Sequence, residues 1–130
     1  MVRGIIVPDM RSASQDTIDR HGLMSLAEAS EIVGYSQEAT LILVRRGDLL
    51  AIDRSGRPRF PGFQFCDGQV APEIKYLNMV AMLSEMDSAD LFFWMVRPCP
   101  QLEDETPADV FCYDPERVLA VARNVLNSGW

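Results

Sequence analysis

The sequence predicts a mainly α-helical protein with one short β-hairpin. Polar residues that cap helices, such as Ser25 and Thr106, stand directly before apolar residues of helical spacing. Proline takes the first helical position at Pro107, where its missing N–H leaves no bond unmade. A turn over 53–56 separates two short runs that favour extended backbone.

Composition is that of a folded protein that does not enter a membrane. The 130 residues are 48% hydrophobic and contain no low-complexity run. No apolar stretch approaches the ~18 residues that a membrane span needs, and residues 1–10 lack the pattern of a signal peptide. We therefore expect a cytoplasmic protein.

The segment 25–46 predicts two short helices joined by a tight turn. Ser25 and Glu28 form a capping box before a helix that Gly34 ends. A second helix is expected over 37–46, with Gly47 after it. Two helices joined by a turn of about three residues have the spacing of a helix-turn-helix.

A β-hairpin, or wing, is expected next. Residues 49–52 and 57–60 flank the turn 53–56, where Gly56 supplies a positive φ. Between residues 41 and 60 five arginines face two acids, a local net charge of +3, whereas the whole chain carries −7. Residues 73–116 hold ten acids and two bases, a net of −8. This asymmetry suggests two different partners, although a charged run can also be a solvated face.

The helix-turn-helix is expected to bind operator DNA. A reading helix presents polar side chains to base edges, and basic side chains nearby contact phosphates. Glu38 would repel phosphate and Leu41 reads bases poorly, so the alternative is a helix-turn-helix retained for packing or dimerisation. The candidate DNA contacts are Gln37, Thr40, Arg45, Arg46, Arg54, Arg57 and Arg59.

Two further helices are expected over 73–86, after Pro72, and over 89–96, capped by Ser88. In the second, residues 91–96 run without a polar break and should be almost wholly buried. The first has an apolar stripe for the core, made of Ile74, Leu77, Val80 or Ala81, and Leu83. The other flank of this helix could pack in the core, against a partner protein or against a second copy of the chain, and we expect the contact of a homodimer. The residues of this flank are Tyr76, Met79, Met82 and Met86.

Residues 98–126 place two proline-started helices behind a proline-bracketed loop. Thr106 and Pro107 begin a short helix, in which Asp109 stands where a capping-box acid would lie. Asp114 and Pro115 begin a longer helix over 115–126.

This block resembles the toxin-binding domain of the Xre/MbcA/ParS antitoxins. Their pattern runs Pro-x-Pro-x-Leu-Gly-Gly-x-x-Pro-Leu-x-x-Leu and continues with an Asp-Pro-x-x-Val-Leu-x-x-Ala helix. Glu103 and Asp104 stand where that family has paired glycines. The residues in register are Pro98, Pro100, Leu102, Pro107, Phe111, Asp114, Pro115, Val118, Leu119 and Ala122.

The preceding segment, 23–65, resembles the winged helix-turn-helix of excisionase and MerR-like proteins. The motifs that carry this likeness are Val33-Gly34-x-Ser36 and Arg45-x-Gly47-x-Leu49. The expected organisation is an N-terminal segment over 1–22, a small winged helix-turn-helix over 23–65 and a helical toxin-binding domain over 66–130. Residues 2–7 could pair as an edge strand.

The resemblance implies an antitoxin of a type II toxin-antitoxin pair. Such a protein neutralises a RES-domain toxin, which consumes NAD, by occluding its active site, and represses its own gene pair. The alternative is a free-standing helix-turn-helix regulator or adaptor whose C-terminal domain mediates oligomerisation. The apolar face of the last helix predicts toxin contacts at Val121, Val125, Leu126 and Trp130.

Catalysis, cofactors and metal sites are not expected. His21 is the only histidine and has no nucleophile or metal ligand near it in the sequence. Cys66, Cys99 and Cys112 are odd in number and far apart, which favours buried free thiols over a disulfide or a zinc site. A pairing of His21 with one of these cysteines stays an alternative. The sequence predicts a binding protein rather than an enzyme.

Overall fold

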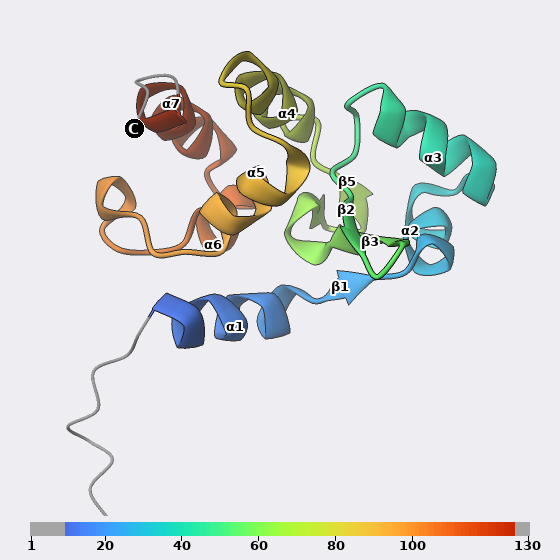
Figure 1. Cartoon of the computed structure of the whole chain (residues 1–130), viewed down its shortest axis with the longest axis horizontal. Helices are drawn as coiled ribbons and strands as arrows, with labels where there is room; N and C mark the ends of the chain where they lie inside the picture. The colour runs from blue at the N-terminus through green and yellow to red at the C-terminus, as the bar shows by residue number, and fades with distance from the viewer. Residues whose placement is uncertain (1–9, 127–130) are drawn as a thin grey trace, which may run out of the picture.

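The computed structural model describes residues 10–126, which form a mainly helical fold with two small antiparallel sheets. The first half of the chain holds α1 (Met10–His21), β1 (Leu23–Met24), α2 (Leu26–Val33), α3 (Gln37–Arg45), β2 (Ile52–Arg54) and β3 (Arg57–Pro61). The second half holds α4 (Ile74–Leu83), α5 (Ser88–Met95), α6 (Pro107–Phe111) and α7 (Pro115–Leu126). In Figure 1 these halves lie side by side, with α1 running beneath α5 and α6.

Short elements connect the two halves and shape the loop before α6. A 3-10 turn, η1 (Gly62–Gln64), leads into a two-stranded sheet of β4 (Phe65–Cys66) and β5 (Gln69–Val70). A second 3-10 turn, η2 (Pro100–Leu102), lies inside the proline-bracketed loop.

Most of the predicted helix starts are confirmed. Ser25 Oγ accepts from the Glu28 N–H at 3.1 Å while Glu28 Oε1 accepts from the Ser25 N–H at 2.8 Å, which completes the capping box. Thr106 Oγ1 accepts from the Asp109 N–H at 3.1 Å. The cap of α5 was predicted wrongly. Asp87, rather than Ser88, is the N-cap residue, and its carboxylate accepts a hydrogen bond from the Asp90 N–H at 2.9 Å.

The hairpin forms as predicted, and a third strand joins it. Ser55 and Gly56 both have positive φ at its turn, 56° and 79°. β3 pairs with β2 on one side and with β1 on the other, so the order is β1-β3-β2. Neither β1 nor α1 was predicted, and the proposed strand over residues 2–7 lies outside the described residues.

The core consists of one large cluster and one small one. The large cluster joins α4, α5, α6 and α7 and also takes in Leu50, Ile52 and Phe63 from the first half. The small cluster holds three fully buried side chains, Ala29, Leu49 and Phe60. The hydrophobic centre of the molecule therefore lies in the second half.

Two apolar residues expected in the core lie outside it. Leu83 is 72% exposed, because it follows buried Ala81 by two residues, a turn of about 200° around the helix. Phe93 is 50% exposed, since α5 is buried on one side only, through Leu91, Phe92 and Met95.

The expectation of three free thiols is wrong. Cys66 and Cys112 form a disulfide with a Cα–Cα distance of 5.6 Å, and Cys99 alone is a buried free thiol. The fold brings β4 against the end of α6. The sequence did not indicate this proximity, because the two cysteines are 46 residues apart. Among the described residues, the helices are too short or too polar to cross a membrane.

Candidate nucleic-acid interface

The two helices α2 and α3 are locked together by a buried hydroxyl pair. Ser30 Oγ donates to Thr40 Oγ1 at 3.0 Å, and Thr40 Oγ1 donates to the Ser36 carbonyl at 2.8 Å. Thr40 is fully buried by this arrangement. Its prediction as a DNA contact is therefore wrong, because the helix turns this side chain toward α2.

The outer face of α3 is only partly polar. Gln37, Glu38 and Arg45 are exposed, as the sequence predicted. Ile42 shares this face and is 45% exposed. An acid and an aliphatic side chain thus occupy positions where a base-reading helix usually carries polar groups.

The hairpin carries the strongest concentration of positive charge near these helices. Arg54 lies directly opposite Arg57 in the strand register, and Arg59 follows two residues later on the same face. The three side chains, with Leu23 and Ser55, line a shallow hollow of about 400 Å³. Like charges directly opposite each other on two strands are destabilising, and an anion in the hollow would relieve that repulsion.

An acid stands near this basic group. The backbone N–H and the hydroxyl of Ser25 lower the pKa of the Glu28 carboxyl, and the charge of Arg59 lowers it further. Glu28 therefore stays ionised beside the hairpin and reduces its net positive field.

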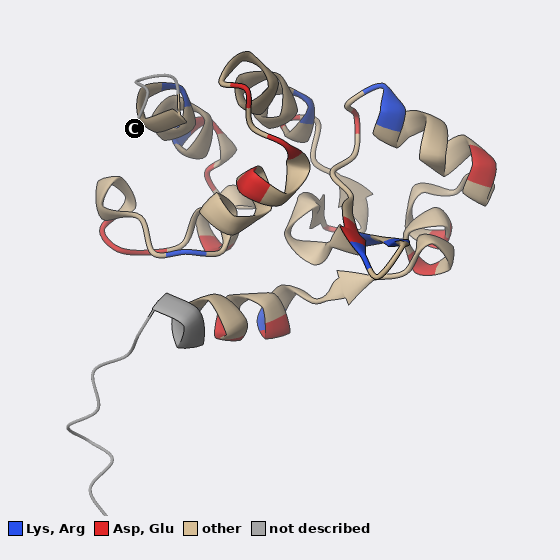
Figure 2. Cartoon of the chain, viewed as in Figure 1, with Lys and Arg blue, Asp and Glu red and all other residues tan. Residues whose placement is uncertain are grey.

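Around α2, α3 and the hairpin, the basic residues form two groups, one at the hairpin and one at the end of α3 (Figure 2). Arg45 and Arg46 make up the second group, and Arg46 Nε lies 3.6 Å from Asp48 Oδ2. Arg46 remains 69% exposed, so solvent and ligands have access to its guanidinium. The start of α3, at the other end of this helix from Arg45, is acidic in the same view.

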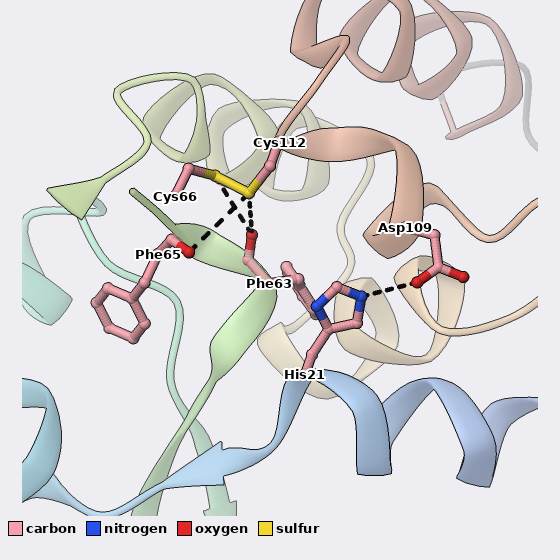
Figure 3. The surroundings of a disulfide bond; sticks show 6 residues. All are labelled: His21, Phe63, Phe65, Cys66, Asp109 and Cys112. Atoms are coloured by element: carbon pink, nitrogen blue, oxygen red, sulfur yellow. Dashed lines mark hydrogen bonds and ion pairs between the residues drawn. A yellow bond between two sulfur atoms is a disulfide. The ribbon is translucent and has the colours of Figure 1, made fainter. Parts of the chain in front are cut away.

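A second polar cluster joins α1 to α6. His21 Nε2 lies 2.8 Å from Asp109 Oδ1 (Figure 3). Arg20 pairs with the other carboxylate oxygen of Asp109. Burial raises the pKa of Asp109, but the hydrogen bonds of Arg20, His21 and Thr106 outweigh it, so this pKa lies below its usual value. No pattern in the sequence indicated this cluster, because its partners are 88 and 89 residues apart.

The disulfide lies beside this cluster without forming a catalytic group with it. Cys112 Sγ is 3.5 Å and Cys66 Sγ 3.8 Å from the Phe63 carbonyl oxygen (Figure 3). Neither sulfur carries a hydrogen or a negative charge while the bond is closed, so neither acts as a nucleophile. Among residues 10–126 the side chains that bind metals also form no group of three that could hold an ion.

The residues predicted to bind a toxin lie mostly in the core. Leu126 is 2% exposed and is a core residue, because α7 turns it toward the other helices. Val121 and Val125 are partly buried and pack against the same core. Trp130 lies outside the described residues.

The residues predicted to form a dimer contact remain accessible. Tyr76, Met79 and Met82 are 47%, 44% and 68% exposed, and Met86 is partly buried against the core. Met79, Met82 and Met86 line a groove of about 530 Å³ that also includes Arg45 and Arg46.

Comparison with known proteins shows a likeness in fold. No protein-family model matches this chain, and no curated protein matches it. The chain is similar to the NMR structure of Rv2175c, with a TM-score of 0.73 and 18% sequence identity. The match covers 95% of this chain and 86% of that one.

Proposed function

We propose that the first half of this chain is a winged helix-turn-helix that binds duplex DNA and regulates transcription. The observation that carries the proposal is the hairpin with Arg54 opposite Arg57, held beside the α2–α3 pair by strand β1. Two like charges at one end of a hairpin favour a ligand with closely spaced negative charges. The phosphates of a DNA backbone have that property.

In this proposal the hairpin supplies affinity and α3 supplies a small part of the sequence preference. Arg54, Arg57 and Arg59 neutralise phosphates, while Gln37 at the start of α3 contacts base edges. Ile42 and Glu38 lie on the same exposed face; the Ile42 side chain has no polar group, and the Glu38 carboxylate repels phosphate. Binding should therefore depend strongly on salt and only weakly on sequence.

Titration of fluorescent duplex DNA with the full chain tests the proposal. Arg54→Ala with Arg57→Ala should weaken binding to all sequences alike. It should also reduce the slope of log K against log salt by about 0.9 for each phosphate that is no longer neutralised. Gln37→Ala should change the preference between sequences instead. Arg123→Ala, an exposed arginine on α7, is the matched control and should leave binding unchanged.

Either of two results would overturn DNA binding. One is the absence of any complex with duplex DNA, including the promoter of its own gene, at low salt. The other is a loss in log K for the Arg123 control that is half that of the hairpin variant, which removes two charges, since binding would then follow net charge alone.

We also infer a second candidate function, that of an antitoxin for a RES-like toxin in the cytoplasm. One observation favours it: Glu103 and Asp104 have φ of 57° and 66°. These residues stand where the antitoxin family carries paired glycines, and their backbone has the left-handed conformation that glycine adopts most easily. The change of residue type thus leaves the loop shape compatible with that family.

Co-expression with the RES-like toxin of a neighbouring gene tests this second function. The full chain should restore growth, and removal of residues 127–130 should release toxicity, because Trp130 is the predicted anchor. If the shortened chain protects fully, the tail has no part in neutralisation. If the full chain gives no protection, or no such toxin is encoded nearby, the antitoxin function is rejected and the free-standing regulator remains as the proposed function.

A further inference from the structure

We infer that the outward face of α4 binds the same face of a second copy of this chain, with the two α4 helices antiparallel. The buried side of α4 carries Ile74, Leu77 and Ala81. Lys75, Met79 and Met82 follow one another at spacings of four and three residues, which places them on the opposite side of the helix. Met86 lies in the loop after α4 and packs partly against the core. This proposal does not depend on DNA binding or on a toxin.

The exposed area on this face is unusual for a monomer's surface. Met79 is 44% and Met82 68% exposed, and the flanking residues Tyr76 and Leu83 are 47% and 72% exposed. Single exposed apolar residues are common, but four on one short helix form a continuous apolar patch. Such a patch indicates a surface that is covered when the protein is assembled.

The charges at the two ends of the patch identify the occupant. The Asn78 amide donates to the Gly47 carbonyl at 2.8 Å, so the end of α3 lies beside the first half of α4. Arg45, Arg46 and Lys75 make this end basic. The other end is acidic, with exposed Glu85 and Asp87 in the loop after α4 (Figure 2).

A patch that is basic at one end, apolar in the middle and acidic at the other end is complementary to itself. A two-fold axis midway between Met79 and Met82 would set Met79 against Met82 of the second copy. The same axis brings Lys75 level with residues 85–87 of that copy, so each basic end meets an acidic end. Isologous dimers require this self-complementarity, whereas an unrelated partner does not.

The contact is small, so the dimer should be weak. A single pair of short helices buries less than the ~1,200 Å² typical of stable complexes. We therefore expect dissociation in the micromolar range and a decrease in affinity as salt rises.

Sedimentation equilibrium of the full chain, at concentrations up to about 100 µM, is the first test. The unaltered protein should be dimeric at the upper end of this range. Met79→Glu with Met82→Glu should weaken association at least 10-fold and leave the circular dichroism and melting temperature unchanged, because both side chains are exposed. Tyr35→Glu, at a similarly exposed position before α3, is the matched control and should still dimerise.

A charge swap tests the antiparallel geometry independently of the methionines. Lys75→Glu alone sets two acids against each other at both ends of the dimer, and Glu85→Lys alone sets two bases. Each variant should be monomeric by itself. In a heterodimer of the two variants, the introduced acid faces the introduced base at one end. The other end keeps the original Lys75 and Glu85. An equimolar mixture should therefore form this heterodimer.

Three results would overturn the inference. An unaltered protein that is monomeric throughout the concentration range removes the dimer. Unfolding of the double glutamate variant would assign Met79 and Met82 to the core instead. A mixture of the two charge variants that stays monomeric, while the unaltered protein dimerises, would reject the antiparallel arrangement.

Discussion

The two halves of this molecule differ in where their stability comes from. The first half, which presents the arginine hairpin, has a cluster of three fully buried side chains. The second half contributes most of a much larger cluster, into which the first half inserts Leu50, Ile52 and Phe63. The basic surface is therefore displayed by a unit that the acidic half supports.

Two covalent or ionic links between the halves fall in one region, around α6. The disulfide joins Cys66 of β4 to Cys112 after α6, and Asp109 of α6 holds Arg20 and His21 of α1. Phe63, between them in space, is part of the large cluster. Removing these links one at a time measures how much each half depends on the other.

The largest effect should follow from opening the disulfide. Closing a loop of 46 residues restricts the unfolded chain, which stabilises the fold by about 4 kcal/mol on the chain-entropy account. Reduction, or Cys66→Ser with Cys112→Ser, should lower the melting temperature by about 10 °C or more. Thermal denaturation followed by circular dichroism, with and without reductant, measures this difference.

The same double variant supplies the control for reductant. Its melting temperature should not respond to reductant, because the remaining thiol, Cys99, is already free. An unaltered protein with equal melting temperatures in both conditions would contradict a stabilising link between the halves.

A buried amide should have the next largest effect, within the first half. Gln64 Oε1 accepts from the Leu50 N–H at 2.8 Å, and its Nε2 donates to the carbonyls of Leu50 and Pro61. Gln64→Ala leaves these backbone groups buried without partners, which should cost about 2–3 kcal/mol in unfolding free energy. Urea denaturation measures it, and exposed Gln69→Ala, with an expected loss near zero, is the control.

The features that the sequence predicted correctly depend on neighbouring residues. Ser25 with Glu28, Thr106 with Pro107, and the turn at Gly56 were predicted because caps and turns are set within a few residues. Those signals located α2, α6 and the hairpin. They needed no knowledge of the rest of the chain.

The features that were predicted wrongly depend on partners far away in the sequence. Asp109 was predicted to complete a local capping box, but its carboxylate turns to Arg20 and His21. Cys66 and Cys112 were predicted to be free because their approach requires the whole second half to pack. Thr40 is polar and suited to DNA, and only its contact with α2 shows that it is buried.

Asp109 should make the link between α1 and α6 dependent on pH. Because its pKa is lowered in the folded protein, its contribution to stability is present above the pKa of the unfolded chain, near 4, and is lost as pH falls through the folded value. Asp109→Asn should reduce stability at pH 7 by about 1 kcal/mol, after allowance for solvent screening of a side chain that is 28% exposed. The gap in melting temperature from the unaltered protein should narrow as the pH is lowered from 7 to 3, because protonation removes the charge of the carboxylate.

Asp53→Asn is the control for this pH dependence, since Asp53 is exposed in the hairpin. It should melt like the unaltered protein at both pH values. A gap for Asp109→Asn that persists unchanged at low pH would mean that the carboxylate charge is not what holds α1.

The smallest effect should come from the second half alone, and it should be stabilising. Glu103 and Asp104 have left-handed backbone conformation, which costs a non-glycine residue roughly 1–2 kcal/mol. Glycine avoids this cost, but its unfolded state has a larger conformational entropy, which cancels part of the stabilisation. Glu103→Gly with Asp104→Gly should therefore raise the unfolding free energy by about 1 kcal/mol in urea denaturation, despite the loss of the exposed Glu103–Arg117 ion pair. Glu103→Ala with Asp104→Ala removes the same side chains and keeps both Cβ atoms, so it should give no gain. Equal stability of the glycine and alanine variants would show that the backbone at 103–104 is not strained, and would remove the loop's likeness to a paired-glycine turn.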